Sequence, residues 1–415
     1  MTLKTLMTTH WFEPEGGAAG HPGIVARSLK ARGHEVHVVT GFPTYPKGEI
    51  FDGYRNSLYQ REDLDGMAVH RGAVYPSHDN RAIHRAANYL SFAAVGSLTA
   101  HRAPKKMDVG LVYSSPATAA IPAMVVRATR RLPYVLYVQD LWPDSVTASG
   151  FLDEAKQGLV ERALHRFCGA AYDRAAHIAV SAPGMARLLH ERGVPSRKIS
   201  VLPNWADERH FEPRERDIDQ ARALDVSAPT VLMYAGNFGE LQNLETVIEA
   251  ARLLRDRHDI VIALVGSGVT ETRLRAQAEQ HDLRNVRFLP PQPFERISNV
   301  LALADAQLVT LKDVPVLRST LPSKLQANLA AGQPIIGSVS GDAAAVIEDA
   351  AAGFTAPPGD APALANAMMS FADMSSDARN RLRTNSRNAY EQNFSEKVIG
   401  DELSALLHKA ARSRG

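Results

Sequence analysis

A lysine stands at the start of a predicted helix, in the stretch LPSK over residues 321–324. Proline and serine favour the first turn of a helix. The ammonium group of Lys324 faces the positive end of the helix dipole, which is unfavourable unless an anion binds beside it. Lys324 is therefore either a solvated surface residue or the positive charge of an anion site that includes Ser323.

Two loops that contain glycines follow predicted strands. The first reads HWFEPEGG over residues 10–17, and the second reads YAGNFGELQN over residues 234–243. Gly16 and Gly17 allow a ligand to approach the backbone just before a helix, where an anion such as phosphate is favoured. The side chains of Asn237 and Gln242 can donate hydrogen bonds to a diphosphate. Both loops are also compatible with ordinary turns and helix caps.

Polar residues follow a third, apolar strand, predicted over residues 134–138. They are Gln139, Asp140 and Asp144, placed where parallel α/β sheets build their sites. The two aspartates alternatively cap the next segment. Neither has histidine or glutamate neighbours at metal-ligand spacing, so we predict no metal site. The sequence also shows no nucleophile elbow, Walker loop or nucleic-acid-binding motif.

The elements that must position these residues form two series. Short β-branched runs alternate with amphipathic helix-length segments, which is typical of a mostly parallel α/β sheet. The first series has predicted strands at residues 5–9, 36–40, 109–114, 134–139, 178–181 and 199–202. A charged stretch at 212–229, with two prolines, reads as a linker. The second series has predicted strands at residues 230–236, 260–265, 286–289, 307–311, 334–339 and 353–356.

Composition narrows the class of protein. The 415 residues suit two domains, and 45% hydrophobic with 22% charged residues is an ordinary soluble composition. The single cysteine, Cys168, cannot form an internal disulfide. We predict a cytoplasmic protein, because neither a signal-peptide core nor an apolar run of membrane-spanning length is present.

Charge is unevenly distributed. Residues 1–205 contain 24 basic and 17 acidic residues, whereas the remainder contains 23 basic and 28 acidic ones. Within the basic half, the apolar stretch 89–100 is flanked by Arg81, His84, Arg85, His101, Arg102, Lys105 and Lys106. The segment 81–106 is either a core helix with solvated basic ends or an element that lies in a membrane interface.

Read in order, these motifs resemble glycosyltransferase family 4, whose members are retaining enzymes with the GT-B fold. The closest likeness is to the subgroup of colanic-acid and O-antigen fucosyl- or N-acetylfucosaminyltransferases. The matching stretches are FEPEGGAA at 12–19, RGHEV at 32–36, TGFPTYP at 40–46, DLWPDS at 140–145, PN at 203–204, AGN at 235–237 and PSK at 322–324. The resemblance covers nearly the whole chain.

The resemblance implies an α/β fold of two Rossmann-like doubly wound domains with an interdomain cleft. The expected parts are an acceptor-side domain at 1–205, a nucleotide-sugar domain at 206–385 and a helical segment at 386–415 that returns to the first domain. Expected donor-binding residues are Gly16, Gly17, Asn237, Gln242, Ser323, Lys324, Gln326 and Asn328. Lys324, Asp140 and Gln139 are expected in catalysis, with His10 and Glu13 on the acceptor side.

The chain departs from the wider family at several site positions. Ser319 and Ala327 stand where the family carries two glutamates that contact ribose and sugar hydroxyls, and Gln326 and Asn328 are neighbours that can help. Asn237 and Gln242 replace a phosphate-binding arginine and lysine, so the resemblance assigns the missing positive charge to Lys324. Gln139 replaces a histidine.

The expected function is transfer of a sugar, with retention, from a nucleotide diphosphate sugar, UDP-linked by resemblance, to a hydroxyl acceptor in polysaccharide or glycoconjugate biosynthesis. Neither a cofactor nor a metal is expected. The acceptor is lipid-linked in many relatives, and peripheral membrane contact would suit it. Two alternatives share the fold: a nucleotide-sugar epimerase that needs no acceptor, and a non-catalytic nucleotide-sugar-binding protein.

Overall fold

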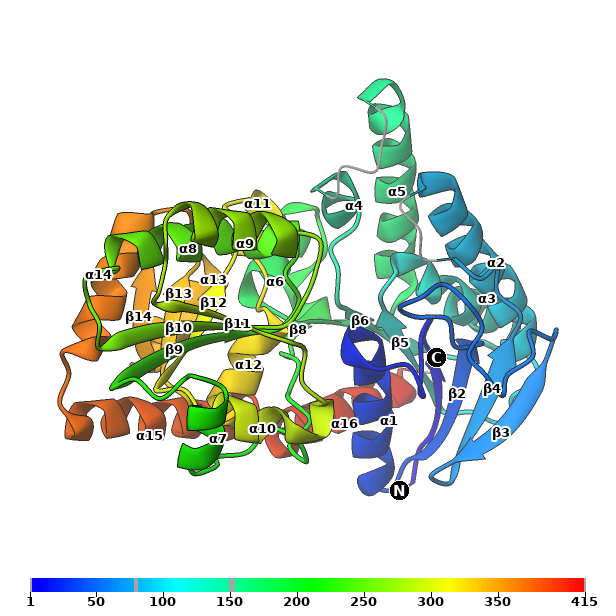
Figure 1. Ribbon diagram of the computed structural model, residues 1–415. Coiled ribbons are helices and arrows are strands. Elements are labelled where there is room, and N and C mark those ends of the chain that lie inside the picture. Colours follow the sequence, from blue (N-terminus) through cyan, green and yellow to red (C-terminus); the bar gives the residue numbers. More distant parts are fainter. Residues whose placement is uncertain (1, 78–80, 149–153, 414–415) are drawn as a thin grey trace. The chain divides into compact units, whose positions relative to one another are not determined.

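The computed structural model describes residues 2–77, 81–148 and 154–413 (Figure 1). The chain divides into two units, each built on its own sheet. Unit 1 comprises Met1–Leu202 and Gly400–Gly415, and unit 2 comprises Pro203–Ile399.

Unit 1 has an eight-stranded sheet in the order β3-β4-β2-β1-β5-β6-β7-β8. All pairings are parallel except β3 with β4. The central strands β5 and β6 are buried along their whole length, because helices cover both faces of a parallel sheet. The strands are β1 (Lys4–Thr8), β2 (Glu35–Gly41), β3 (Gln60–Leu64), β4 (Met67–Gly72), β5 (Val109–Ser114), β6 (Tyr134–Val138), β7 (His177–Val180) and β8 (Ile199–Val201).

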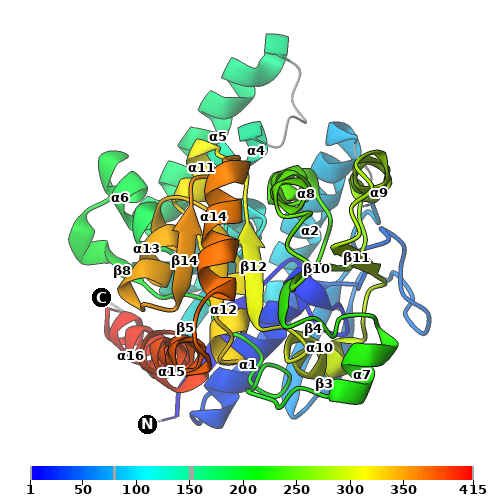
Figure 2. The same cartoon turned by 60° about the vertical axis from the view of Figure 1, so that its left-hand side comes forward.

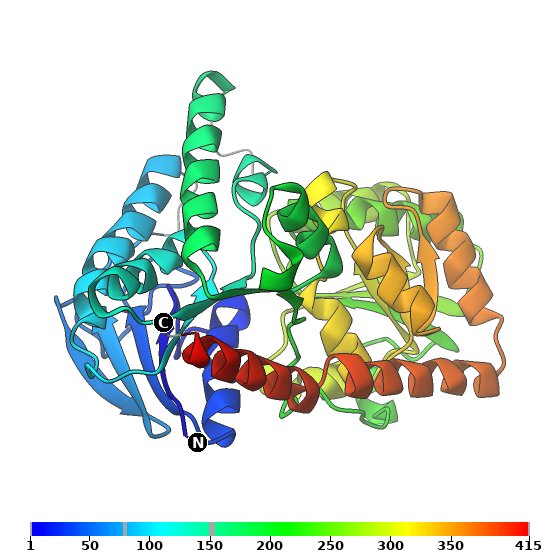
Figure 3. The ribbon, with the colours of Figure 1, turned by 180° about the vertical axis from the view of Figure 1, so that it is seen from behind.

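Helices α2, α3, α5 and α6 cover one face of this sheet, and α1 and α16 cover the other (Figure 3). From Gly400 onward, α16 packs beside α1. Arg32 Nε donates to Asp401 Oδ1 at 2.8 Å, and His34 Nε2 lies 2.8 Å from Ser404 Oγ. The helices of this unit are α1 (His21–Ala31), α2 (Ala82–Ala100), α3 (Ala120–Arg130), α4 (Asp144–Ala148), α5 (Glu154–Arg174), α6 (Pro183–Glu191) and, from Gly400, α16 (Glu396–Arg412).

Unit 2 has a six-stranded, fully parallel sheet in the order β11-β10-β9-β12-β13-β14. Helices α8, α9 and α14 lie on one face, and α10, α12 and α15 lie on the other (Figure 2). The strands are β9 (Thr230–Ala235), β10 (Ile260–Val265), β11 (Val286–Leu289), β12 (Ala306–Thr310), β13 (Ile335–Ser338) and β14 (Gly353–Ala356). The helices are α7 (Ile218–Ala223), α8 (Leu244–Leu253), α9 (Glu271–Gln280), α10 (Ile297–Leu301), α11 (Pro315–Arg318), α12 (Ser323–Ala330), α13 (Asp342–Asp349), α14 (Ala361–Ala372) and α15 (Ser376–Asn393).

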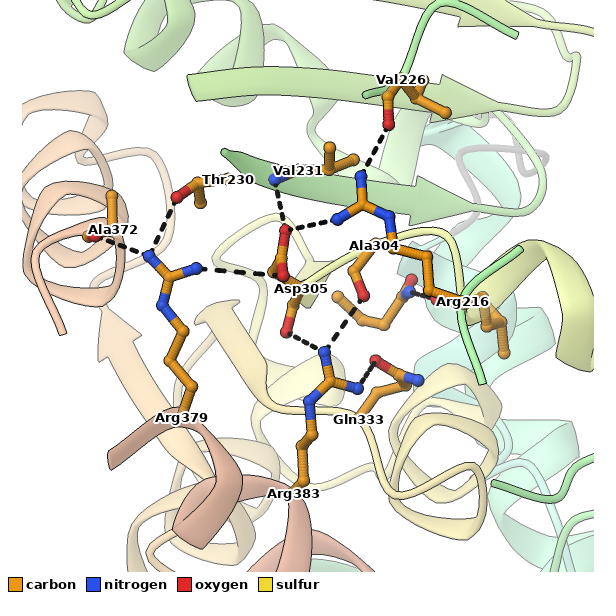
Figure 4. Close-up of polar contacts among 12 residues, drawn as sticks. Arg216, Val226, Thr230, Val231, Ala304, Asp305, Gln333, Ala372, Arg379 and Arg383 are labelled. Carbon is orange, nitrogen blue, oxygen red and sulfur yellow. Dashed lines mark hydrogen bonds and ion pairs between the residues drawn. The ribbon is translucent and has the colours of Figure 1, made fainter. Parts of the chain in front are cut away.

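A polar network around Asp305 holds α15 against the amino ends of the unit 2 strands (Figure 4). Asp305 Oδ2 accepts the backbone N–H of Val231 at 2.8 Å and a guanidinium N–H of Arg216 at 3.3 Å. Arg379 lies 3.9 Å from the other carboxylate oxygen, and Arg383 donates to the Asp305 carbonyl at 3.5 Å. Partly buried charges of this kind are stabilised by pairing, so the network fixes the end of the sheet opposite the candidate donor residues.

The secondary structure differs from the sequence predictions at three places. Strands β3 and β4 were not predicted, and β3 (QREDL) is an edge strand whose polar side chains lack an apolar pattern. The predicted linker 212–229 contains the short helix α7, and the helix predicted to follow Gly16 and Gly17 begins with a 3₁₀ turn at Gly17–Gly20. Among the described helices, none is long and apolar enough to cross a membrane.

Candidate functional site

The loops that follow β9 and β10 approach each other so closely that two positions exclude a side chain. Gly236 has a φ of +146°, and a Cβ atom there would lie 2.4 Å from Cε of Lys324. A Cβ atom on Gly266 would lie 1.9 Å from the carbonyl oxygen of Gly236. The backbone contact requires glycine at residue 266, and the positive φ requires it at residue 236. The two glycines bring the two loops and the Lys324 side chain together at the carboxyl end of the sheet, where α/β proteins bind ligands.

Lys324 lies in the first turn of α12, directly after Ser323. Burial lowers the pKa of its ammonium group to about 8. Its Nζ lies 4.9 Å from the centre of the Tyr234 ring, a cation–π distance. Within the described part of the chain, Nζ has no hydrogen-bond or ion-pair partner. A desolvated cation without a counter-ion, at a helix N-terminus, is a site that an anion would stabilise.

Asn237 and Gln242 flank Gly239 in the same loop. A Cβ atom on Gly239 would lie 2.8 Å from Asn237 Nδ2 and 2.4 Å from Gln242 Oε1. The loop backbone is fixed from the sheet side, since the Tyr234 hydroxyl donates to the Asn237 carbonyl at 2.7 Å and Thr310 Oγ1 donates to the Gln242 carbonyl at 2.6 Å. Both amide side chains thus lie on the loop that Lys324 contacts.

The remaining predicted residues of α12 are placed differently. Ser323 is exposed at the start of the helix, whereas Gln326 and Asn328 are buried. Gln326 Oε1 is buried without a hydrogen-bond partner among the described residues. No hydrogen bond in the described part of the chain joins Gln326 or Asn328 to the loop at 236–243. The structure therefore brings Lys324, Asn237 and Gln242 together and leaves Gln326 and Asn328 inside the helix packing.

In unit 1, His10 lies two residues after the carboxyl end of β1 and is only 3% exposed. Asn88 Nδ2 donates to the Tyr75 carbonyl at 2.6 Å, so its Oδ1 faces His10 Nε2 at 2.7 Å. Nε2 therefore carries the proton, and Nδ1 presents a lone pair that has no partner among the described residues. Burial lowers the pKa of His10 to about 4, opposed by the Asn88 hydrogen bond, so the imidazole is neutral near neutral pH.

A buried carboxylate and a buried guanidinium fix the loop at 10–17. The Glu15 carboxylate accepts the backbone N–H groups of Phe12, Thr44 and Tyr45 at 2.7–2.9 Å. Burial raises the pKa of Glu15 to about 7, against these hydrogen bonds and the nearby charge of Arg71. Arg71, fully buried, pairs with Glu62 at 2.6 Å and donates to the carbonyls of Gly41 and Glu13. These contacts join the loops that follow β1 and β2.

The two glycines of this loop are open to solvent. Gly16 and Gly17 are exposed, and no atom lies within 4 Å of a Cβ built on either residue. Gly17 has a φ of +62°, which favours glycine. The Glu13 carboxylate pairs with Arg27 of α1. Space for a ligand is thus present at the glycines, while the Glu13 carboxylate is already held by a cation.

Gln139 and Asp140 follow the carboxyl end of β6, as predicted from the sequence. The Gln139 backbone N–H donates to the Ser114 carbonyl at 3.3 Å, and Ser115 Oγ donates to Asp140 Oδ2 at 2.7 Å. Asp140 reaches solvent, yet surrounding protein removes enough hydration to raise the pKa of its carboxyl group, against the Ser115 hydrogen bond. Asp144, four residues on, pairs with Arg192.

No group of three or more His, Cys, Asp or Glu side chains in the described ranges is arranged to hold a metal ion.

Comparison with known proteins identifies the family. A family model described as "Glycosyl transferase 4-like domain" matches residues 16–205, and one described as "Glycosyl transferases group 1" matches residues 215–389. The putative colanic acid biosynthesis glycosyl transferase WcaI of Escherichia coli (strain K12) is 31% identical over 339 residues, covering 80% of this chain and 82% of WcaI. The chain belongs to this glycosyltransferase family. The probable glycosyltransferase WbjE of Pseudomonas aeruginosa is 24% identical over 334 residues, again 80% of this chain and 82% of the relative.

Solved structures agree on the fold of this glycosyltransferase. HepE of Anabaena, solved in complex with UDP and glucose, has a TM-score of 0.69 at 16% identity, covering 98% of this chain and 99% of HepE. WaaG, a glycosyltransferase involved in lipopolysaccharide biosynthesis, has a TM-score of 0.66 at 17% identity, covering 97% and 99% of the two chains. The predicted GT-B fold with two Rossmann-like units is confirmed.

Several residues that shape these loops were not predicted. Asn88 sets the tautomer of His10 from α2, 78 residues away in the sequence, and Arg71 reaches two loops from inside the sheet. No local pattern marks either residue. Glu15 lies within one of the stretches that carry the resemblance, FEPEGGAA at 12–19, and Tyr234 directly precedes another, AGN at 235–237. A charged or phenolic residue between apolar neighbours was the available signal.

Because the folded state excludes a proton from His10, acid should destabilise the protein through this residue. The pKa of His10 is about 4 in the folded state and about 6.5 in the unfolded state. The contribution of the neutral imidazole to the free energy of unfolding is therefore fully present above pH 6.5 and is lost as the pH falls toward 4. At pH 5 the loss amounts to about 2 kcal/mol. Urea unfolding at pH 7.5 and at pH 5 gives the free energy of unfolding at each pH. The decrease in this free energy between pH 7.5 and pH 5 should be smaller in His10→Gln than in the wild type, by about 2 kcal/mol. His165→Gln, at an exposed position of α5, is the control. Equal losses in His10→Gln and the wild type would contradict the assignment.

Proposed function

We propose that this glycosyltransferase transfers a sugar, with retention of configuration, from a UDP-linked donor to a hydroxyl acceptor in bacterial polysaccharide or glycoconjugate biosynthesis. The observation that carries the proposal is the partly desolvated Lys324 ammonium group, which lies against Gly236 without a counter-ion among the described residues. Support for the donor comes from HepE, solved with UDP-glucose, and support for the pathway comes from WcaI, named for colanic acid biosynthesis.

Unit 2 would hold the diphosphate of the donor. Lys324 would stabilise the negative charge that develops on the leaving diphosphate, and Asn237 and Gln242 would donate hydrogen bonds to it. Ser323 would add a hydroxyl and a backbone N–H at the helix start. Such groups accelerate transfer because they are already oriented before the bond breaks.

Unit 1 would contribute the acceptor side. The unpartnered Nδ1 of His10 can accept a hydrogen bond from a sugar hydroxyl, and the Asp140 carboxylate and Gln139 amide offer further polar contacts. The open backbone at Gly16 and Gly17 suits a phosphate group. In the retaining mechanism the departing phosphate takes the acceptor proton on the face that it leaves, so none of these residues needs to act as a strong base.

Product analysis tests the proposal against its alternatives. UDP-sugars incubated with the enzyme and a polyprenyl-diphosphate-linked sugar should yield a glycosylated lipid with the donor's anomeric configuration, together with UDP. An epimerised donor formed without acceptor would indicate an epimerase. Donor binding with neither transfer nor hydrolysis would indicate a binding protein.

Contact with the membrane surface would bring the enzyme to such a lipid-linked acceptor, and we propose a cytoplasmic protein peripheral to the inner face of the membrane. One side of α2 packs in the core through Phe92, but Ile83, Leu90 and Leu98 are 74%, 58% and 72% exposed. Basic residues flank the helix, including Arg102 and the exposed Lys105 and Lys106. Exposed apolar residues beside basic ones suit an anionic interface.

Sedimentation with vesicles of phosphatidylcholine and phosphatidylglycerol tests this contact. The bound fraction should rise with phosphatidylglycerol and fall at high salt, because each basic residue near an anionic surface adds up to about 1 kcal/mol. The variant Ile83→Ser/Leu90→Ser should bind less, and Leu58→Ser, at an exposed apolar residue outside α2, is the matched control. Protein that stays in the supernatant at low salt and high phosphatidylglycerol would favour a soluble acceptor.

Replacing the buried lysine should disable transfer. Lys324→Ala is expected to lower kcat by about 10²-fold or more, as loss of a charge stabiliser at the leaving group does. Lys324→Arg should not restore the rate, because a planar guanidinium does not fit where a compact ammonium packs against Gly236. Arg255→Ala, at an exposed arginine of unit 2, controls for loss of a positive charge. A near-normal rate for Lys324→Ala would show that the lysine has no role in transfer.

Transfer should not depend on a divalent ion. The diphosphate would be neutralised by side chains and backbone N–H groups, so activity should persist in excess EDTA and change little on addition of Mg²⁺. Initial rates with and without chelator measure this. Activity that EDTA abolishes and Mg²⁺ restores would contradict it.

A further inference from the structure

The proposed donor brings more negative charge than Lys324 alone can balance. A diphosphate carries about two negative charges at neutral pH, and more as it leaves. Asn237 and Gln242 supply dipoles without a net charge. Because the binding of a multiply charged anion in a partly buried loop needs nearby cations, the side chains around the loop at 236–243 are the place to look for another.

Lys312 lies against this loop. It follows β12, and its backbone N–H donates to the Leu241 carbonyl at 2.9 Å. Its Nζ lies 3.2 Å from Glu240 Oε2, and the two side chains are 39% and 52% exposed. Lys312 is thus fixed at its backbone to the loop that carries Asn237 and Gln242, while its ammonium group is held only by an exposed carboxylate.

Glu240 also holds a second cation. A guanidinium nitrogen of Arg273, on α9, lies 3.1 Å from each Glu240 carboxylate oxygen. Arg273 has a second carboxylate, Glu245, which accepts from its Nε at 2.9 Å. Hydrogen bonds from Arg273 and Lys312 lower the pKa of Glu240, so its carboxylate is charged at neutral pH. Arg273 therefore has two carboxylate partners, whereas Lys312 has Glu240 alone among the described residues.

An exposed ion pair of this kind is weak and exchanges partners readily. A phosphate on the loop would offer Lys312 a more highly charged partner than Glu240. Lys312 has four rotatable carbon–carbon bonds in its side chain and a point-like charge, so its ammonium group can move without displacing its backbone.

We propose that Lys312 is a second diphosphate-binding cation of this glycosyltransferase, and that Glu240 is its temporary counter-ion, exchanged for phosphate when the donor binds. The inference rests on the proposed function, because it assigns the ligand of Lys312 to the same nucleoside diphosphate. It makes Glu240 a competitor of the donor, so removing the two charges should change affinity in opposite directions.

Calorimetric titration of UDP, UMP and uridine into the wild type and variants tests the pair. Lys312→Gln should weaken UDP binding about tenfold and leave uridine binding unchanged. Glu240→Gln should tighten UDP binding about threefold, and this gain should vanish in Lys312→Gln/Glu240→Gln. The matched controls are Arg252→Gln and Glu249→Gln, which break an exposed ion pair on α8 and should leave UDP binding unchanged.

The outcomes separate this inference from the proposed function. If Glu240→Gln weakens UDP binding, the ion pair serves to hold the loop in place and the inference is wrong. If Glu240→Gln tightens UDP binding equally in the Lys312→Gln background, the effect is one of overall charge and the inference is also wrong. If UDP binds normally to Lys312→Gln, the inference fails while the proposed donor site stands. If the wild type binds none of UDP, GDP and dTDP, both fail.

Discussion

One ammonium group, that of Lys324, is partly desolvated beside a glycine backbone, with no carboxylate to balance it among the described residues. An unpaired, partly desolvated cation destabilises the protein without ligand, and an anion that binds beside it removes this destabilisation. Much of unit 2 serves to keep the lysine there. Gly236 leaves room for the lysine side chain, and Gly266 leaves room for the backbone of Gly236. Arg387 of α15 donates at 2.6 Å to the Ala330 carbonyl at the other end of α12.

In unit 1, by contrast, the buried Arg71 and Glu15 side chains both have partners within the protein. Arg71 is paired and hydrogen-bonded on several sides, and the Glu15 carboxylate accepts three backbone N–H groups. These hydrogen bonds fix the loops that carry His10, Gly16 and Gly17. Nδ1 of the neutral His10 is buried and has no hydrogen-bond partner among the described residues. Under the proposed function, the unpaired charge of Lys324 would lie on the donor side and the neutral lone pair of His10 on the acceptor side, which suits transfer in which the leaving group takes the proton.

The fold was largely predictable, because strands such as β5, β6 and β10 are continuous apolar runs and helices such as α8 carry an apolar face. Strand β3 was not predictable, because it is an edge strand whose side chains are mostly polar and show no apolar pattern. Lys324, Asn237 and Gln242 could be chosen from local spacing, and they do lie together. Local spacing could not identify Asn88, Arg71 and Lys312. Each of them contacts residues 30 or more positions away in the sequence, and such contacts leave no local pattern. The burial of Gln326 and Asn328 follows from how α12 packs, which the family resemblance alone did not reveal.

The central claim is that the Lys324 ammonium group meets the diphosphate, and its titration tests this directly. The pKa can be followed by NMR of isotopically labelled lysine, assigned with Lys324→Arg, in the free protein and at saturation with UDP. The pKa should be near 8 without ligand and should rise by at least about one unit with UDP, because an opposite charge beside a buried lysine favours its charged form. A pKa that UDP leaves unchanged would contradict the account.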